Sequence, residues 1–237
     1  MIKNKTSGYY REECNKIAWL YDPLIRILAR SFGGERKIRK RILNLLNLKA
    51  DDKVLDAACG TGTSALIMAE MVGANGEVVG IDLSPNMLAV SKAKLIKIAK
   101  NKIASPLARN DNVKSQNISF LIANSEDIPY PDNYFDKVHI SVALHEMIYE
   151  GRVNTLREIQ RVLKPSGIFV AADYYNKPHG IAAKLIFKFL MLIEADTARD
   201  MMERGLSNEV RDIGFDVKEI IILLRGMAQV IVAWKSA

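Results

Sequence analysis

The stretch Val54-Leu55-Asp56-Ala57-Ala58-Cys59-Gly60-Thr61-Gly62 joins an apolar run to a carboxylate and then to two glycines. The apolar residues are typical of a buried strand, and the glycines let the backbone turn tightly and approach a ligand. The following segment, Ser64 to Met71, has the composition and spacing of a helix. A strand, a glycine turn and a helix in this order predict a nucleotide-type cradle.

Two carboxylates follow successive predicted strands. Asp56 precedes the glycine turn, and Asp82 closes the next apolar run twenty residues after Gly62. This is the spacing at which an acidic residue reaches a ribose 2′-hydroxyl in doubly wound sheets. Residues 60–65 also fit the loose dinucleotide fingerprint, but Asp56 would repel a pyrophosphate. S-adenosylmethionine (SAM) carries an ammonium and a sulfonium, so the pattern favours SAM over a dinucleotide.

Length and composition indicate a globular protein of one large domain. The chain has 237 residues, of which 49% are hydrophobic and 26% charged. Residues 1–50 hold twelve Lys/Arg against four Asp/Glu, so the net charge of +7 originates in the N-terminal part. The two cysteines, Cys14 and Cys59, have no metal-ligand spacing, and we expect neither a metal site nor a disulfide framework.

The sequence also bears on location. The first sixteen residues are polar and contain no apolar signal core. No run reaches the roughly eighteen apolar residues of a membrane span. We therefore expect a cytoplasmic protein, with peripheral attachment to a membrane left open.

Apolar strands and helices alternate from Lys53 onwards, which predicts a parallel α/β sheet of the doubly wound type. Five strands are expected near residues 53–57, 77–82, 118–123, 135–141 and 167–173. Helices are expected at 64–71, from Ser84 towards Lys100 and at 155–163, the last ending in the turn 164–167. Residues 217–224 and 227–234 flank Arg225-Gly226 and predict an antiparallel hairpin at the sheet edge.

Five segments in order resemble motifs of the class I SAM-dependent methyltransferases. They are residues 54–62, 79–88, 125–130, 135–138 and 156–165. The resemblance covers residues 50–175 and implies a seven-stranded, Rossmann-like methyltransferase fold whose last strand is antiparallel. Within this superfamily the chain is most similar to the ubiquinone/menaquinone biosynthesis C-methyltransferases and the bacterial phosphatidylethanolamine N-methyltransferases, on the residues Tyr21-Asp22 and Gln229-Val230-Ile231-Val232.

The resemblance implies a set of cofactor contacts. Asp56, Gly60 and Gly62 would hold the methionyl end of SAM, and Asp82 the ribose hydroxyls. Met87 would cover one adenine face, and the segment Asn124-Ser125-Glu126 would meet the adenine edge. The same set includes Ala58, Thr61, Leu83 and Ser141.

Two departures from the family pattern stand out. Asn124 occupies a position where the family usually has Asp, and its amide oxygen still provides the acceptor that an exocyclic amine needs. Ala58 replaces the first glycine of the family motif.

The catalytic group is less clear than the cofactor site. Methyl transfer to an amine needs no base, whereas transfer to a quinol carbon or a hydroxyl does. His145, after the fourth strand, and Tyr21 are the candidates, and Asp173 either faces the ligand crevice or caps a helix. Tyr149, Tyr174 and Tyr175 are weaker candidates.

Two segments outside the core bear on the acceptor. A helix over 35–48 is basic and amphipathic, and its cations 36–41 fit a solvated face, an anionic membrane surface or nucleic acid, in that order. Residues 180–195 are apolar almost all round, interrupted by Lys184 and Lys188. We expect a buried lid there, with contact to a membrane surface as the alternative, and an apolar acceptor.

The sequence therefore predicts one methyltransferase domain over 1–237. It comprises an N-terminal helical cap (1–50), a SAM-binding core (51–175), a lid with connecting helices (176–212) and a terminal hairpin (213–237). The predicted activity is methyl transfer from SAM to a small, apolar or lipid- or quinone-like acceptor. The alternatives are an RNA or protein methyltransferase, although no RNA-binding module is visible, and a SAM-binding regulatory protein without catalysis. The sequence does not fix the acceptor or the oligomeric state.

Overall fold

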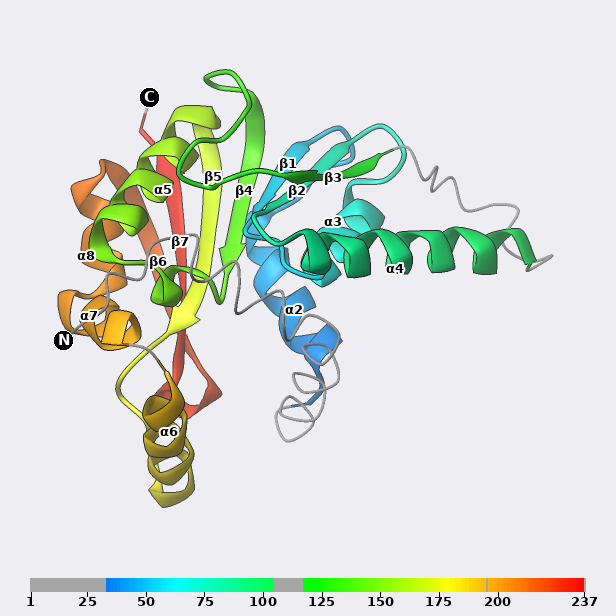
Figure 1. Cartoon of the computed structure of the whole chain (residues 1–237). Helices are drawn as coiled ribbons and strands as arrows, with labels where there is room; N and C mark the ends of the chain where they lie inside the picture. Colours follow the sequence, from blue (N-terminus) through cyan, green and yellow to red (C-terminus); the bar gives the residue numbers. More distant parts are fainter. Residues whose placement is uncertain (1–32, 105–116, 195, 237) are drawn as a thin grey trace.

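Seven strands form one sheet in the computed structural model, which describes residues 33–104, 117–194 and 196–236 (Figure 1). The order across the sheet is β3-β2-β1-β4-β5-β7-β6. The strands are β1 (Lys53–Ala57), β2 (Glu77–Asp82), β3 (Ile118–Ile122), β4 (Phe135–Ser141), β5 (Leu163–Tyr174), β6 (Phe215–Leu223) and β7 (Ala228–Lys235). The order reverses between β1 and β4, which is the place where doubly wound sheets bind their ligands.

The sheet is parallel except for β7. Strands β1 to β5 pair in parallel, and β7 is antiparallel to both β5 and β6. The expected α/β fold with an antiparallel terminal hairpin is thereby confirmed. β5 begins at Leu163, so the predicted turn 164–167 lies within this strand. The pairing of β5 with β4 shifts in register there, between Phe135 and Lys137.

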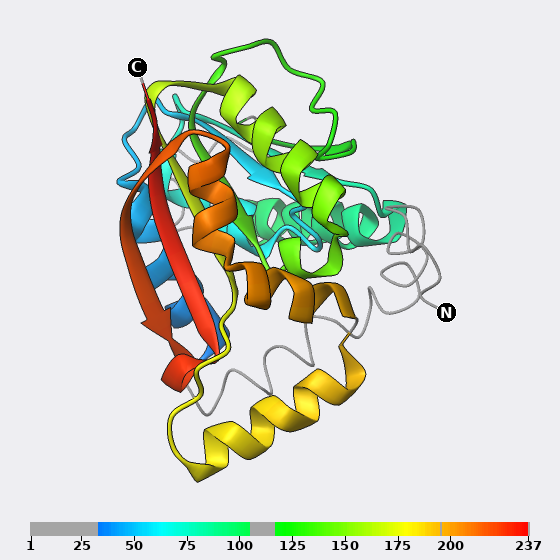
Figure 2. The same cartoon turned by 90° about the vertical axis from the view of Figure 1, so that its left-hand side faces the viewer.

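Helices cover both faces of the sheet and bury an apolar core on each (Figures 1 and 2). One face packs against α5 (Tyr149–Val162), α7 (Asp196–Arg204) and α8 (Leu206–Asp212) through Leu156, Met201 and Val210. The other packs against α2 (Glu35–Leu43), the short 3₁₀ helix η1 (Asn44–Leu46), α3 (Thr63–Val72) and α4 (Pro85–Ala104). The remaining 3₁₀ helices are η3 (Leu144–Glu146) and η4 (Leu224–Gly226).

The basic helix predicted over 35–48 is shorter than expected. It forms α2 and then tightens into η1, which ends at Asn47 in the left-handed conformation (φ 49°). Residues 1–32, which include the rest of the predicted cap and Tyr21, lie outside the described residues. The predicted domain divisions stay predictions.

The segment predicted as a buried lid forms α6 (Ile181–Ile193), and that prediction is wrong in one respect. Among the residues 181–192, whose burial the structure describes, only Ala183 and Phe187 are buried, and both pack against Met227. The outward face is apolar and solvent-exposed, and it consists of Ile181, Leu185, Ile186, Phe189 and Leu192, with exposed fractions from 47% to 81%. The helix projects from the body of the protein at the end towards which β4 and β5 point (Figures 1 and 2).

Candidate active site

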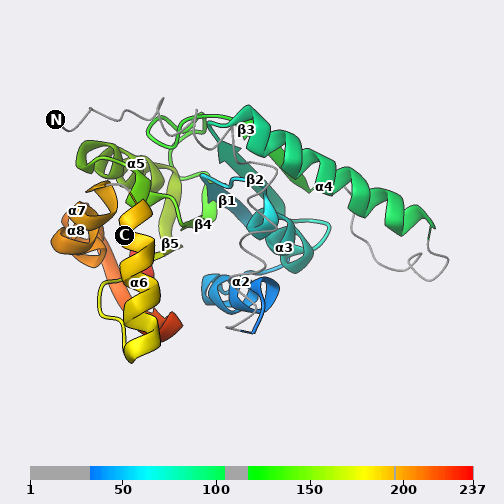
Figure 3. The ribbon, with the colours of Figure 1, turned by 60° about the horizontal axis from the view of Figure 1, so that its bottom comes forward.

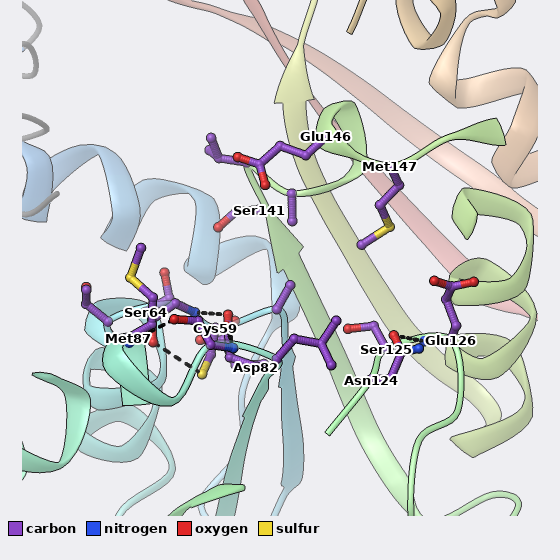
Figure 4. Close-up of a pocket in the computed structure, with 18 of the residues that line it drawn as sticks. Cys59, Ser64, Asp82, Met87, Asn124, Ser125, Glu126, Ser141, Glu146 and Met147 are labelled. Atoms are coloured by element: carbon purple, nitrogen blue, oxygen red, sulfur yellow. Dashed lines mark hydrogen bonds between the residues drawn. The ribbon is translucent and has the colours of Figure 1, made fainter. Parts of the chain in front are cut away.

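One pocket lies at the carboxyl ends of β1, β2 and β4 (Figure 4). Eleven of the twelve predicted cofactor contacts line it: Asp56, Ala58, Gly60, Thr61, Asp82, Leu83, Met87, Asn124, Ser125, Glu126 and Ser141. The pocket is completed by residues that were not predicted, chiefly Arg39, Cys59, Ser64 and the run from Val142 to Ile148, from which Leu144 and His145 are absent. The parallel sheet thus gathers three motifs that are distant in the sequence.

Gly62 is the predicted contact that does not line the pocket. It occupies the N-cap of α3 with φ 72°, a conformation that favours glycine. A Cβ atom there would lie 2.7 Å from the Phe120 ring and from Cβ of Ser91. Gly62 therefore serves the close packing of α3 and β3 against the turn.

Asp56 of β1 lines the pocket. Asp56 is the register partner of His139 on the neighbouring strand β4, and its Oδ1 lies 2.7 Å from Nδ1 of that histidine. Both side chains are 2% exposed. Oδ2 of Asp56 is buried and has no hydrogen-bond partner among the described residues. A buried carboxylate oxygen without a donor is costly, so the site is suited to a ligand that brings a donor.

Asp82 fixes the glycine turn. Its Oδ2 accepts the N–H of Gly60 at 2.7 Å, and its Oδ1 accepts the N–H of Ser84 at 2.8 Å. Burial, aided by the charge of Asp56, raises the pKa of Asp82 against the lowering effect of these two donors. A cation in the pocket would relieve this destabilisation of the charged form.

The third part of the pocket follows β3. Oδ1 of Asn124 accepts the N–H of Glu126 at 3.1 Å and so closes a small turn. An amide oxygen has two lone pairs, and one therefore stays available for a ligand donor. Asn124 retains the acceptor that its position in the motif requires.

Two residues of the pocket wall have positive φ angles where glycine is absent. Ala58 has φ 51°, at the position where the family motif has glycine. Val142, directly after β4, has φ 54°, which is costly for a β-branched residue. Such strain is common at ligand sites because the fold holds the backbone in place for another purpose.

The described residues make the pocket acidic. Among them, the charged residues that line it are the four carboxylates Asp56, Asp82, Glu126 and Glu146 and one cation, Arg39. Arg39 is itself held by Glu35 at 2.9 Å and by Oγ of Ser64. This excess of negative charge favours a cationic ligand and opposes a pyrophosphate.

His145, the candidate catalytic residue after β4, is buried away from the pocket lining. The ring is 3% exposed, does not line the pocket, and places Nδ1 2.8 Å from Oδ1 of Asp173. Burial alone would lower the pKa of His145, but Asp173 outweighs it and raises the pKa to about 9. Asp173 also accepts the backbone N–H groups of His145, within η3, and of Tyr174, and it does not line the pocket.

The tyrosines give no substitute. None of Tyr149, Tyr174 and Tyr175 lines the pocket. The hydroxyl of Tyr174 donates to Glu194 at 2.8 Å, and the ring of Tyr149 stacks under Arg204. Tyr21 lies outside the described residues.

Glu146 is a pocket residue that the sequence analysis missed. It follows His145 in η3, and Figure 4 shows its carboxylate reaching over the pocket near Ser141. Burial raises the pKa of Glu146, aided by Asp173, Glu194 and Asp82 and opposed by His145. The spacing of residues could not single out Glu146, because the connection between β4 and α5 is irregular. This connection turns His145 into the protein interior and Glu146 into the pocket.

The comparisons with known proteins agree with this geometry. A model of the ubiE/COQ5 methyltransferase family matches residues 3–191. The chain belongs to this family. It is 30% identical over 215 residues to an uncharacterized methyltransferase of Synechocystis, covering 91% of each chain. It is 33% identical over 180 residues to a demethylmenaquinone methyltransferase of Staphylococcus saprophyticus, covering 75% of this chain and 68% of the relative.

The solved structures show the same fold. A SAM-dependent methyltransferase from Aquifex aeolicus superimposes with a TM-score of 0.62 at 20% identity, covering 83% of this chain and 89% of the other. The protein is a SAM-dependent methyltransferase of the ubiquinone/menaquinone type with a Rossmann-like fold. The unpartnered oxygen of Asp56 and the acidic lining fit SAM, whose methionyl end is cationic.

Proposed function

We propose that this methyltransferase acts on the reduced, hydroquinone form of an apolar quinone and methylates a ring carbon. The observation that carries the proposal is the division of the pocket into two parts. The acidic part is formed by the residues after β1, β2 and β3. The second part follows β4 and is lined mainly by apolar groups, Val142, Ala143, Met147 and Ile148. Relatives in this family are named for demethylmenaquinone, which is such a quinone.

The protein's own residues would hold the two reactants in order. SAM, when bound, supplies an electrophilic methyl group on a sulfonium with a neutral thioether as leaving group. Asp56 would accept from the ammonium of SAM and Asp82 from its ribose hydroxyls, while Asn124 would accept from the adenine amine. The apolar wall after β4 would exclude water and align the acceptor ring, and such positioning supplies much of the rate in displacement reactions.

The test is methyl transfer from labelled SAM to reduced demethylmenaquinone dispersed in detergent. We expect label in the organic phase and a product heavier by one methylene. A protein that binds SAM by calorimetry but leaves the quinol unlabelled would overturn the proposed acceptor. In that case, label in the RNA or protein fraction of a cell extract would favour a macromolecular acceptor, and label in no fraction would favour a SAM-binding regulator.

We also propose that the protein acts in the cytoplasm while in contact with a membrane, because its acceptor would reside there. The contact surface is the outward face of α6, formed by Ile181, Leu185, Ile186, Phe189 and Leu192. An exposed apolar face of this kind is unusual on a soluble protein and marks an interaction site. No helix in the described part of the chain is long and apolar enough to cross a membrane.

Charge points to an anionic lipid surface as the occupant. Residues 175–193 contain Lys177, Lys184 and Lys188 and no Asp or Glu. Lys184 and Lys188 are exposed one turn apart along the border of the apolar face, where their ammonium groups can reach lipid headgroups. Lys37, Lys40 and Arg41 of α2 are also exposed. Figure 3 shows α6 and α2 together at the end of the molecule turned towards the viewer.

Vesicle cosedimentation of the full chain tests this contact. We expect binding to vesicles rich in phosphatidylglycerol and weak binding to phosphatidylcholine. Leu185→Asp with Phe189→Asp should weaken binding more than tenfold, because each apolar side chain contributes about 1.5–3 kcal/mol when buried. Ile96→Asp is the matched control, since Ile96 is 55% exposed on α4. Two results would refute the lipid surface. One is equal vesicle binding by the α6 double variant and Ile96→Asp. The other is a parent protein that does not bind vesicles but self-associates, with the self-association lost in the α6 double variant.

A further inference from the structure

Replacing a ring hydrogen by a methyl group releases one proton. In the proposed reaction, a C–C bond forms to the ring carbon, the S–C bond breaks, and its electron pair stays on sulfur. The hydroquinone O–H loses its proton as the ring becomes nucleophilic. After the C–C bond has formed, the ring C–H proton leaves and the ring oxygen takes up a proton, which restores the aromatic hydroquinone with one proton released overall. A protein group that accepts the proton and has a pKa close to the working pH lowers the activation barrier of the methyl transfer.

The buried pair His145 and Asp173 does not meet this need. Nδ1 of His145 is engaged by Asp173 at 2.8 Å, and Nε2 points towards Glu194 at 3.8 Å. The pair is excluded from the pocket surface and carries a proton at neutral pH. A group that is buried and already protonated cannot take up the proton of the hydroquinone.

Glu146 occupies the required place. Among the described pocket residues it is the carboxylate that follows β4, while Asp56, Asp82 and Glu126 lie at or beyond the carboxyl ends of β1, β2 and β3. In Figure 4 its side chain lies above Ser141, across the pocket from Asp82 and Met87. In an in-line displacement the methyl acceptor lies opposite the sulfur. With SAM held by the residues after β1, β2 and β3, as proposed, the acceptor would lie on the β4 side, which Glu146 borders.

The surroundings of Glu146 suit a proton acceptor. His145 on the same element faces it with positive charge, whereas Asp173 of β5, Glu194 after α6 and Asp82 of β2 face it with negative charge. Burial and these three carboxylates together outweigh the histidine and raise its pKa. Such tuning brings a carboxyl group towards neutral pH, where general bases are most effective.

We infer that Glu146 is the catalytic residue that accepts the hydroquinone proton, and that His145 with Asp173 positions it. The inference rests on the proposed quinol acceptor. The hydrogen bond that the backbone N–H of His145 donates to Asp173 anchors η3 to β5. This anchor sets the direction in which the next side chain leaves the chain.

Glu146→Gln is the decisive variant, because it keeps the shape of the side chain and removes its basicity. We expect SAM affinity by calorimetry within twofold of the parent and kcat with reduced demethylmenaquinone lowered about 10²- to 10⁴-fold, with KM little changed. The acid limb of the kcat–pH profile should vanish. Glu146→Asp should keep that limb at a reduced kcat, and Glu150→Gln, an exposed carboxylate in the first turn of α5, serves as the matched control.

A readout independent of turnover separates the two proposals. Infrared difference spectra of the SAM-loaded protein should show a protonated carboxyl band that titrates above the usual range of Glu and is lost in Glu146→Gln. A parent protein that shows this band but does not methylate the quinol refutes the proposed acceptor and leaves the titration of Glu146 standing. A parent that methylates the quinol, with Glu146→Gln retaining kcat within threefold, overturns the inference.

Discussion

Nδ1 of His139 lies 2.7 Å from Oδ1 of Asp56, although the two residues are 83 positions apart in the chain. The parallel register of β1 and β4 places them side by side on the same face of the sheet. An ionised carboxylate only accepts hydrogen bonds, so Nδ1 carries the proton. The bond occupies Oδ1 of Asp56, a residue that lines the pocket, and leaves Oδ2 buried without a donor among the described residues.

Asp56→Asn should therefore weaken SAM binding. A hydrogen bond between two charged groups contributes about 1.5–3 kcal/mol, which corresponds to about a 10- to 100-fold rise in Kd. Titration calorimetry measures this directly. Asp51→Asn, at an exposed position before β1, is the control. Parent-like affinity in Asp56→Asn would remove Asp56 from the cofactor site.

Asp82→Ala should abolish measurable SAM binding, because it removes the ribose acceptor and frees the N–H groups of Gly60 and Ser84. The raised pKa of Asp82 adds a pH dependence. A cationic ligand prefers the ionised carboxylate, so SAM affinity should fall as the pH is lowered through the pKa of Asp82. Calorimetry from pH 7 to pH 5 checks both points, and an unchanged titration would refute the assignment.

The strand pattern could be predicted from the sequence because buried parallel strands have a strong signal. β1, β2 and β4 begin and end at the expected residues, since each is a short apolar run bounded by a turn or a carboxylate. α5 begins six residues earlier than predicted, at Tyr149. Its first turn contains Gly151 and the buried Arg152, which do not fit an apolar helical pattern.

The half of the pocket after β4 could not be predicted in the same way. Glycines and carboxylates in the sequence indicate the cofactor side of the pocket. The connection around η3 instead contains Val142 with a positive φ and the buried pair His145–Asp173, and both depend on tertiary contacts. For the same reason α6 was expected to be buried. Its apolar composition is clear from the sequence, but which of its faces packs on the protein is not.

The unfolding free energy should depend on His145 above neutral pH. The folded-state pKa of about 9 exceeds the ordinary value of 6.5, so the folded protein holds this proton more tightly than the unfolded chain. The stabilisation is complete below about pH 6.5 and is lost as the pH rises towards 9, by up to about 3 kcal/mol. Urea unfolding at pH 7 and pH 9 should show this loss, and His145→Gln should abolish it. His179→Gln, at an exposed position, should retain it.

Arg152→Ala should be strongly destabilising. The guanidinium is 0% exposed and donates to both carboxylate oxygens of Glu209, to Asp200 and to the carbonyl of Met147. Its removal leaves Glu209 buried without its partner, which costs about 3–5 kcal/mol. Chemical unfolding checks this value. The double variant Arg152→Met with Glu209→Leu should be less destabilised than Arg152→Ala, and the reverse order would contradict the argument.

Gly62→Ala should be clearly destabilising. Gly62 has φ 72° and ψ 14°, in the left-handed region, and a Cβ there would clash with Phe120 and Ser91. The backbone penalty for alanine is about 1 kcal/mol, and the clash adds about 1–3 kcal/mol. Chemical unfolding measures the sum, and a loss of about 1 kcal/mol or less would show that the packing at Gly62 is looser than the structure has it.

The two sides of the pocket are supplied by different parts of the sheet, and this separation affects how the protein can change over time. The loops after β1, β2 and β3 hold the residues assigned to SAM, while the proposed acceptor side is formed by the residues after β4, around η3. Substitutions from Val142 to Ile148 can therefore alter which molecule is methylated without disturbing Asp56 or Asp82. New acceptors are open to descendants of this chain through a few changes in one short connection.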